Sequence, residues 1–168
     1  MNTVLDAIYT RRSIRHFTDE PVNQALIDEI LWAGSWAPSG LNNQPWRFAV
    51  ITDRDLKDKF VPLTRYGKVI EAAACLIPVF LDRQAMYNDV KDHQAAGACI
   101  QNMLLAAHSL GLGAVWLGEI LKSSDQVRKL LGLPENMELM AVLALGHPAR
   151  RDQKSSRKDL EELVIFRR

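Results

Sequence analysis

The sequence is poor in cysteine: Cys75 and Cys99 are its only two, and no CxxC pair occurs. Small disulfide-stabilised domains have more cysteines, and structural zinc sites place theirs at closer spacing. The sequence therefore disfavours both classes. Each cysteine lies in an apolar stretch, "AAACLIPVF" or "AAGACIQNM", so we expect buried and chemically inert thiols.

Long hydrophobic runs are also absent. No stretch reaches the ~18 apolar residues that span a bilayer, and the first ten residues, MNTVLDAIYT, do not have the pattern of a secretion signal. Arg11 and Arg12 form a twin-arginine pair, but polar HFTDEPVNQ follows where an export signal needs an apolar segment. We expect a cytoplasmic protein without a membrane partner.

Charge of one sign is not in excess, because 21 Lys and Arg face 20 Asp and Glu, for a formal net charge of +1. Proteins that bind nucleic acid mainly through its phosphates carry a clear basic excess. The balance disfavours an RNA- or DNA-binding protein, and basic clusters have to be interpreted locally.

Sequence motifs for nucleotide and catalytic sites are missing as well. Neither G-x-x-x-x-G-K-[ST] nor G-x-G-x-x-G occurs, which disfavours a nucleoside triphosphatase and a separate dinucleotide-binding domain. The four histidines, His16, His93, His108 and His147, are scattered and match no catalytic or metal-ligating pattern. We expect no metal site, and an enzyme with this inventory needs a cofactor for its chemistry.

The hydrophobic periodicity predicts a single domain over residues 1–168 that mixes helices and strands, with no repeat or linker. A helix that contains Leu26 and Ala33 is expected to end at the APSG of residues 37–40. Ser123 and Gln126 have the spacing of a capping box. The other expected helices cover 3–10, 53–63, 89–110 and 123–132, and the expected strands lie at 47–52, 75–82, within 111–120 and at 139–146.

Three arginines and a histidine fall within RRSIRHF, residues 11–17. In an extended segment, alternation places Arg11, Ser13 and Arg15 on one side, and Arg12 and Ile14 face the other way. Two guanidiniums beside a hydroxyl suit a phosphate monoester, which accepts charge-assisted hydrogen bonds from arginine. A solvated helix end, where cations meet the carboxyl-terminal dipole, fits the spacing equally well.

The loop PSGLNNQPW, residues 38–46, combines carboxamides, exposed backbone groups and a tryptophan. Such a set can accommodate a flat polar heterocycle. From the residues alone, a tight turn with Trp46 buried in the core is the better interpretation.

Four motifs taken in order resemble the FMN-dependent nitroreductase family along nearly the whole chain. They are a helix running into RRSIR, the loop PSGLNNQPW, the passage AAHSLGLGAVWLG and the ending LGHPARRDQKSSRKDLEELV. The resemblance implies an α+β sandwich with a largely antiparallel central sheet flanked by helices. It also implies a homodimer formed through a long central helix and exchanged terminal segments, for which residues 89–110 and 150–168 are the candidates.

The resemblance assigns the first basic cluster to the phosphate, the ribityl chain and part of the ring edge of FMN. Spacing alone leaves a second basic cluster, within residues 150–158, as an exposed charged segment. In the family, a late arginine returns to the same phosphate and corresponds here to Arg157, with Lys154 as a further candidate. The implied contacts are Arg11, Arg12, Ser13, Arg15 and Arg157.

Three other stretches are similar to family segments that contact FMN. The loop matches residues that reach across the dimer interface to the partner's flavin, with Gln44, Pro45 and Trp46 in support. VWLGEI matches the stretch that lies along one flavin face and offers a backbone N–H towards N5, where Gly118 permits close approach. Larger members place an asparagine and a lysine before the strand that begins near Cys75, and only the lysine has a match here. The implied contacts are Pro38, Ser39, Gly40, Asn42, Lys68, Trp116, Leu117, Gly118 and Glu119.

The function that the resemblance implies is transfer of hydride from NADH or NADPH to N5 of FMN and then of reducing equivalents to a nitroaromatic, quinone or similar acceptor. No side chain is expected to be a catalytic acid or base, and the two substrates are expected to use one site in ping-pong order. One alternative is a specialised branch of the fold that dehalogenates an aromatic substrate or fragments flavin. Another is a flavin-binding sensor or carrier without turnover.

Overall fold

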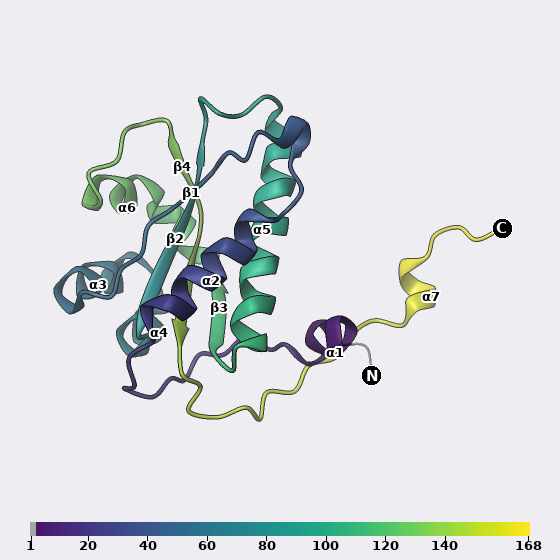
Figure 1. Ribbon diagram of the computed structural model, residues 1–168, viewed down its shortest axis with the longest axis horizontal. Helices are drawn as coiled ribbons and strands as arrows, with labels where there is room; N and C mark the ends of the chain where they lie inside the picture. Colours follow the sequence, from purple (N-terminus) through teal and green to yellow (C-terminus); the bar gives the residue numbers. More distant parts are fainter. Residues whose placement is uncertain (1–2) are drawn as a thin grey trace.

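The computed structural model describes residues 3–168 and has a central sheet between two layers of helices (Figure 1). The strand order is β1-β2-β4-β3, and every neighbouring pair is antiparallel. The bounds are Trp46–Phe48 for β1, Cys75–Asp82 for β2, Gly113–Leu117 for β3 and Met137–Gly146 for β4. The expected α+β sandwich with an antiparallel sheet is confirmed.

Alternating side chains of the central strands supply apolar residues to both faces of the sheet. In β2, Ile77 and Val79 belong to one core, and Leu76 and Phe80 belong to the other. The register shifts between Val79 and Phe80, directly after Pro78. A proline in a central strand has no N–H for the ladder and is tolerated best beside such a bulge.

One face of the sheet is covered by α2 (Gln24–Ser35) and α5 (Asp89–Ser109), so both expected helices are confirmed. The two helices approach closely at Gly34, where an added Cβ would lie 2.6 Å from Cγ of Met103. The core on this side also contains both cysteines, which are free thiols with no exposed surface. Burial raises the pKa of Cys75 to about 11 and that of Cys99 to about 12, which confirms the expectation of inert thiols.

The other face carries α3 (Arg54–Phe60), α4 (Gly67–Ala72) and α6 (Ser124–Leu130). Short 3₁₀ turns, Val61–Leu63 and Glu119–Ser123, follow α3 and precede α6. They enclose the second core, whose largest fully buried side chains include Phe60, Ile70, Leu76, Phe80 and Leu117.

Two expected details of the secondary structure are wrong. The Ser123 side chain does not cap α6; its Oγ donates to the carbonyl of Leu63 at 2.8 Å and so joins the two 3₁₀ turns. The strand expected over 47–52 is reduced to β1 and a single bridge between Ile51 and Leu76. The ladder is interrupted beside Pro78, because proline accepts a bond from Ala49 N but has no N–H to return.

Both ends of the described chain project from the sandwich (Figure 1). The N-terminal helix α1 (Thr3–Thr10) contains no buried residue, although its apolar residues have helical spacing. The segment after β4 ends in α7 (Leu160–Leu163), and Figure 1 shows this helix well away from the sheet. Beyond it, Ile165 is 99% and Phe166 74% exposed.

Candidate functional site

The first basic cluster lies along the outer edge of β3. After α1 the chain extends, Ser13 forms a parallel bridge with Ala114, and the N–H of Ile14 donates to the Ala114 carbonyl at 3.0 Å. Ile14 turns into the core and is 2% exposed. Its side chain lies so close to Gly113 that a Cβ there would be 2.8 Å away. This anchor fixes the polar residues on either side of Ile14 at the sheet edge.

A pocket of about 420 Å³ brings the two basic clusters of the sequence together. A neighbouring cavity of about 360 Å³ shares Arg11, Arg12 and Arg157 with it and extends to Gln101 of α5. We call the larger one the basic pocket. It is lined by Arg11, Arg12, Ser13, Arg15, Gln153, Lys154, Ser155 and Arg157.

The position of Arg12 differs from the expected alternation, because this side chain also lines the basic pocket. Its Nη1 donates to the carbonyls of Tyr9 at 2.8 Å and Arg11 at 2.9 Å. These bonds fold the side chain back over the last turn of α1. Regular alternation fails because Ser13 and Phe17 form single isolated bridges and no continuous strand runs through this segment.

The basic pocket has no acidic side chain in its lining. Within residues 3–168, no ion pair forms at Arg11, Arg12, Arg15 or Arg157. The Nε atoms of Arg11 and Arg12 are buried without a hydrogen-bond partner. Burial lowers the pKa of Arg11, and the charges of Arg12 and Arg157 lower it further. Clustered cations with unused donors fit a multiply charged anion such as a phosphate group.

A histidine beside this cluster responds to the same charges. Nε2 of His108 lies 2.9 Å from Oγ1 of Thr10. Burial lowers its pKa, and the charges of Arg151, Arg11 and Arg12 add to that effect. Arg151 itself is held by a bond from Nη2 to the Gly111 carbonyl at 2.6 Å. The positive field therefore extends from the pocket to the end of α5.

The stretch VWLGEI forms the end of β3 and the turn after it. Trp116 is 41% exposed, and Leu117 is buried. The Glu119 carboxylate is engaged within the chain, because it accepts from Thr64 Oγ1 at 2.6 Å and from Arg65 N at 3.0 Å, and pairs with Lys122 at 2.5 Å. The bonds from Lys122 and Thr64 lower the pKa of Glu119 to about 2. Only the backbone of Glu119 is left to contact a ligand.

Lys68 is exposed in the first turn of α4. The segment that precedes it is fixed by the two bonds from Thr64 and Arg65 to Glu119. The chain thus links this lysine to the turn after β3 through the backbone of the segment 64–68.

The loop 38–46 lies apart from the basic pocket. Pro38, Ser39 and Gly40 line a separate pocket of about 270 Å³ with residues of the first half of α5: Lys91, Gln94, Ala95 and Ala98. Asn42 is exposed. Trp46 is 5% exposed, which confirms its predicted place in the core. Within one chain the structure therefore does not bring the loop to the arginines.

Five residues that line the two cavities were not predicted as site residues: Ile8, Tyr9, Gln101, Gln153 and Ser155. Gln153 and Ser155 flank Lys154 in the sequence, and their place beside this candidate was the one signal that could have identified them. Gln101 is one polar residue on a long helix, and no local pattern distinguishes it.

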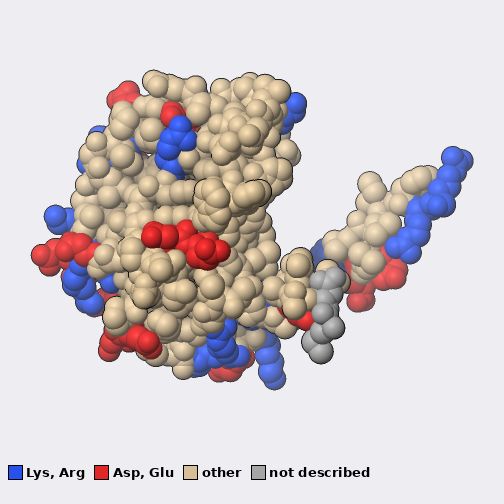
Figure 2. Space-filling model, in the orientation of Figure 1, with Lys and Arg blue, Asp and Glu red and all other residues tan. Residues whose placement is uncertain are grey.

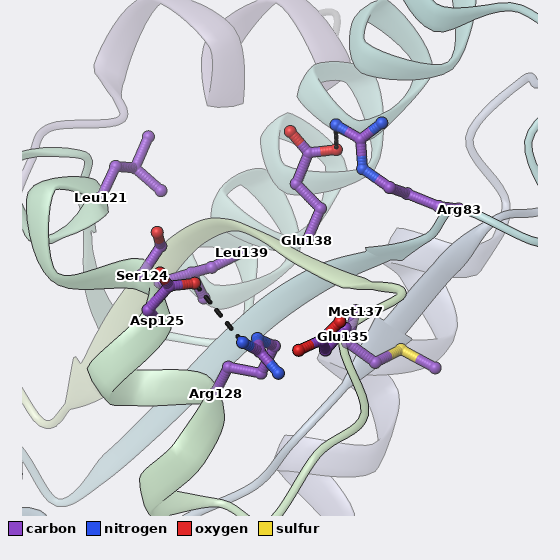
Figure 3. Close-up of a pocket in the computed structure, with 9 residues that line it drawn as sticks. All are labelled: Arg83, Leu121, Ser124, Asp125, Arg128, Glu135, Met137, Glu138 and Leu139. Atoms are coloured by element: carbon purple, nitrogen blue, oxygen red, sulfur yellow. Dashed lines mark ion pairs between the residues drawn. The ribbon is translucent and has the colours of Figure 1, made fainter.

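A larger pocket of about 580 Å³ lies elsewhere, between α6 and the start of β4 (Figure 3). Both arginines of its lining are paired: Arg83 pairs with Glu138 at 2.8 Å, and Arg128 pairs with Asp125 at 3.5 Å. We call it the paired-charge pocket. Figure 2 shows acidic and basic side chains interspersed in a similar way over the visible face of the body. Its lining consists of Arg83, Leu121, Ser124, Asp125, Arg128, Glu135, Met137, Glu138 and Leu139.

A metal site and a membrane-spanning helix are both absent from the described residues. From Thr3 onward, no group of three His, Cys, Asp or Glu side chains is placed to hold a metal ion. In the same part of the chain, no helix combines the length and apolar character needed to cross a membrane.

The structure defines the class as an α+β sandwich with an acid-free basic pocket at the edge of its sheet. Comparison with known proteins makes the class specific, because the sequence profile of the nitroreductase family matches residues 8–77 and 62–147. The chain belongs to the nitroreductase family.

Three similar proteins illustrate this relationship. A Desulfovibrio desulfuricans protein, crystallised in complex with FMN, is 53% identical, with a TM-score of 0.96 over 100% of this chain and 98% of that one. The oxygen-insensitive NADPH nitroreductase of Salmonella typhimurium is 34% identical over an alignment that covers 98% of this chain and 73% of the relative. The NADPH:FMN oxidoreductase of Vibrio harveyi, solved with NAD+, is 29% identical, with a TM-score of 0.91 over 99% and 78% of the two chains.

Proposed function

We propose that the protein is a flavoenzyme that uses FMN to pass reducing equivalents from NADH or NADPH to a small organic acceptor. The observation that carries this proposal is the basic pocket, with its buried and unpartnered arginine Nε atoms and no carboxylate. The 53% identical protein crystallised with FMN supports it. Bound FMN supplies the redox chemistry by accepting hydride at N5 from a reduced nicotinamide and later delivering the electrons to the acceptor.

The side chains of the basic pocket hold the phosphate end of the cofactor. Arg11, Arg15 and Arg157 supply charged donors, Ser13 supplies a hydroxyl, and Arg12 adds positive charge from above α1. The cost of placing like charges together is offset when the phosphate binds between them.

The end of β3 contributes to the other end of the cofactor. Trp116 and Gly118 are exposed at the end of this edge strand, and the backbone there can donate to a ring nitrogen. Glu119 serves the site through its backbone, and its carboxylate fixes the segment that leads to Lys68. No acid–base residue is assigned, because the nicotinamide and the acceptor exchange electrons with the cofactor itself.

The site is completed by a second copy of the chain, so the active protein is a homodimer. The loop with Pro38, Ser39, Gly40 and Asn42 cannot reach the basic pocket of its own chain, and we assign it to the partner's FMN. Lys91, Gln94, Ala98 and Gln101 follow helical spacing along one side of α5, and this side lines both the loop pocket and the cavity next to the arginines. A partner packed on this side, with residues 150–168 exchanged, brings the two half-sites together.

The donor and the acceptor use the same space in turn, which gives ping-pong kinetics. We take nitroaromatics and quinones as the acceptor class. All of residues 1–168 form a single FMN-binding domain, and the chain has no dinucleotide fingerprint that would supply a second nicotinamide site.

The test is a purification followed by two half-reactions. The protein should be yellow, release noncovalent FMN on denaturation, lose its colour with NADH or NADPH alone under anaerobic conditions, and recover it when a nitroaromatic or quinone is added. Initial rates should give parallel double-reciprocal lines. A colourless protein that ignores added FMN would refute the proposal. Bleaching without recovery by any acceptor would point to the sensor or carrier, and halide release or flavin breakdown to the specialised branch.

A further inference from the structure

Asp92, in the first turn of α5, is wholly buried, with no exposed surface. Lys57 and Thr64 are the other buried polar side chains of the described residues, which leaves Asp92 as the buried carboxylate there. Its Oδ1 accepts from Asn43 Nδ2 at 2.8 Å. Its Oδ2 accepts from the backbone N–H groups of Tyr87 and Asn88, both at 2.9 Å. One carboxylate therefore joins α5 to two separate loops.

The charge on Asp92 is retained in this position. Burial opposes ionisation, but the hydrogen bonds from Asn88 N, Asn43 and Tyr87 N outweigh it and hold the pKa below its ordinary value. Removing any one donor leaves a buried charge less well solvated, which is costly. The carboxylate and its three donors are thus interdependent.

The amide of Asn43 has one orientation that fits. Its Nδ2 donates to Asp92 Oδ1 and also to the Ala85 carbonyl at 3.0 Å, so two acceptors face the same nitrogen. A flipped amide would place Oδ1 against both oxygens. In the observed orientation Oδ1 is buried without a partner, so the two bonds from Nδ2 have to offset that loss.

The loop that carries Asn43 has an unusual backbone. Leu41, Asn42 and Gln44 have φ of 55°, 54° and 46°, in the left-handed region, and none is glycine. Each such residue costs about 1–2 kcal/mol, so the conformation persists only where the surroundings enforce it. Inside the loop, Gln44 N donates to Ser39 Oγ at 3.1 Å. The Asn43 side chain ties the loop to Asp92 and to Ala85.

The second loop held by Asp92 packs against the same segment. Tyr87, whose N–H donates to Asp92, covers Gly40 so closely that a Cβ on Gly40 would lie 2.0 Å from the Tyr87 hydroxyl. Lys91 extends over the Tyr87 ring at 5.5 Å from its centroid. Both sides of the segment 39–44 are therefore positioned by one buried carboxylate.

We infer that Asp92 is a positioning residue for the cofactor: through Asn43 and Tyr87 it holds the loop that carries Ser39, Gly40 and Asn42 in the conformation that meets FMN. The inference rests on the proposed function, because it assigns the loop to the partner's flavin. Asp92 touches no substrate, and its effect reaches the flavin only through the loop.

The test compares Asn43→Ala with Asn136→Ala. Asn136 makes the same kind of bond, from Nδ2 to Asp82 Oδ1 at 2.7 Å, at the start of β4. Both variants lose an asparagine–aspartate bond, so the unfolding temperature should fall in both, and further in Asn43→Ala, which also loses the bond to the Ala85 carbonyl. We expect only Asn43→Ala to weaken FMN binding, by about three- to tenfold, the size of one net hydrogen bond. It should also alter the visible circular dichroism of the bound flavin, which a general loss of stability does not change.

Asp92→Asn and the double variant with Asn43→Ala complete the design. If the two residues act through one network, the double variant should bind FMN no more weakly than Asp92→Asn alone. Should Asp92→Asn not fold, the two asparagine variants still decide the question. Wild-type FMN affinity and circular dichroism in Asn43→Ala, or equal changes in Asn136→Ala, would overturn the inference. Failure of the wild-type protein to bind FMN would instead overturn the proposed function.

Discussion

The basic pocket and the paired-charge pocket are both lined by arginines, but their charges are arranged differently. In the paired-charge pocket, Arg83 and Arg128 each have a carboxylate within 3.5 Å. In the basic pocket, burial and the charges of Arg12 and Arg157 lower the pKa of Arg11, and no carboxylate lines the cavity. The paired-charge pocket is the larger of the two, at about 580 against 420 Å³.

The difference leads us to propose charge compensation, rather than volume, as the guide to the ligand site. An arginine that already has a carboxylate partner gains little from an added anion. A pocket of like charges is destabilised until an anion enters, so its binding energy is available to a ligand. By this criterion the basic pocket, the smaller of the two, is the proposed ligand site.

The largest expected effect separates the two pockets by cofactor affinity. Arg11→Ala, Arg15→Ala and Arg157→Ala should each weaken FMN binding by about 1.5–3 kcal/mol, the scale of a hydrogen bond to a charged group. Titration of apoprotein with FMN, followed by flavin fluorescence, measures the change. Arg128→Ala is the matched control and should bind FMN as the wild type does. Equal affinity in all four variants would remove the distinction between the pockets.

A second prediction uses two histidines as probes of the two environments. The pKa of His93 is raised by its bond to the Asp89 carbonyl and by Glu138 of the paired-charge pocket. The pKa of His108 is lowered by burial and by the nearby arginines. Proton NMR titration should place them on opposite sides of 6.5. Added FMN should raise the pKa of His108, because phosphate offsets the arginine charges, and leave His93 unchanged.

The raised pKa of His93 also predicts how stability depends on pH. A group with a higher pKa in the folded state stabilises the protein fully below its unfolded pKa, near 6.5, and this contribution is lost as pH rises through the folded value. The difference in unfolding free energy between wild type and His93→Gln should therefore be largest below pH 6.5 and shrink above it. A difference that grows with pH would contradict the assignment of the Glu138 contact.

The smallest effect is expected in the absence of cofactor. Arg157→Gln removes one of the like charges near Arg11, so the apoprotein should gain about 0.2–0.5 kcal/mol, the size of an exposed like-charge pair. Urea unfolding of the apoprotein measures it, with Arg83→Gln as the control, which should lose stability because Glu138 loses its partner. Loss of apoprotein stability in Arg157→Gln would show that the charges are compensated after all.

The sequence predicted the long elements and missed those that depend on distant contacts. The elements α5, β2 and β4 are long enough for their hydrophobic patterns to be unambiguous. The six residues of α4 are too few for a period, and its role comes from packing on the second core. Ser123 had the spacing of a cap, but its hydroxyl found the Leu63 carbonyl, 60 residues away.

The site shows the same division between local and distant information. The arginines of both clusters were predicted as candidates, and the resemblance joined them before the structure did. The engaged carboxylate of Glu119 and the buried one of Asp92 were not predicted, because their partners at Thr64 and Asn43 are 55 and 49 residues away. Their effect depends on three-dimensional contacts that no local pattern contains.

The two buried thiols have a consequence for the chemistry that the protein would carry out. Quinones and the reduction products of nitroaromatics are electrophiles that alkylate cysteine, and the species they attack is the thiolate. With no exposed surface and pKa values of about 11 and 12, Cys75 and Cys99 are both inaccessible and uncharged at neutral pH. The protein has no other cysteine. An enzyme built in this way can generate reactive molecules repeatedly without being inactivated at its own thiols.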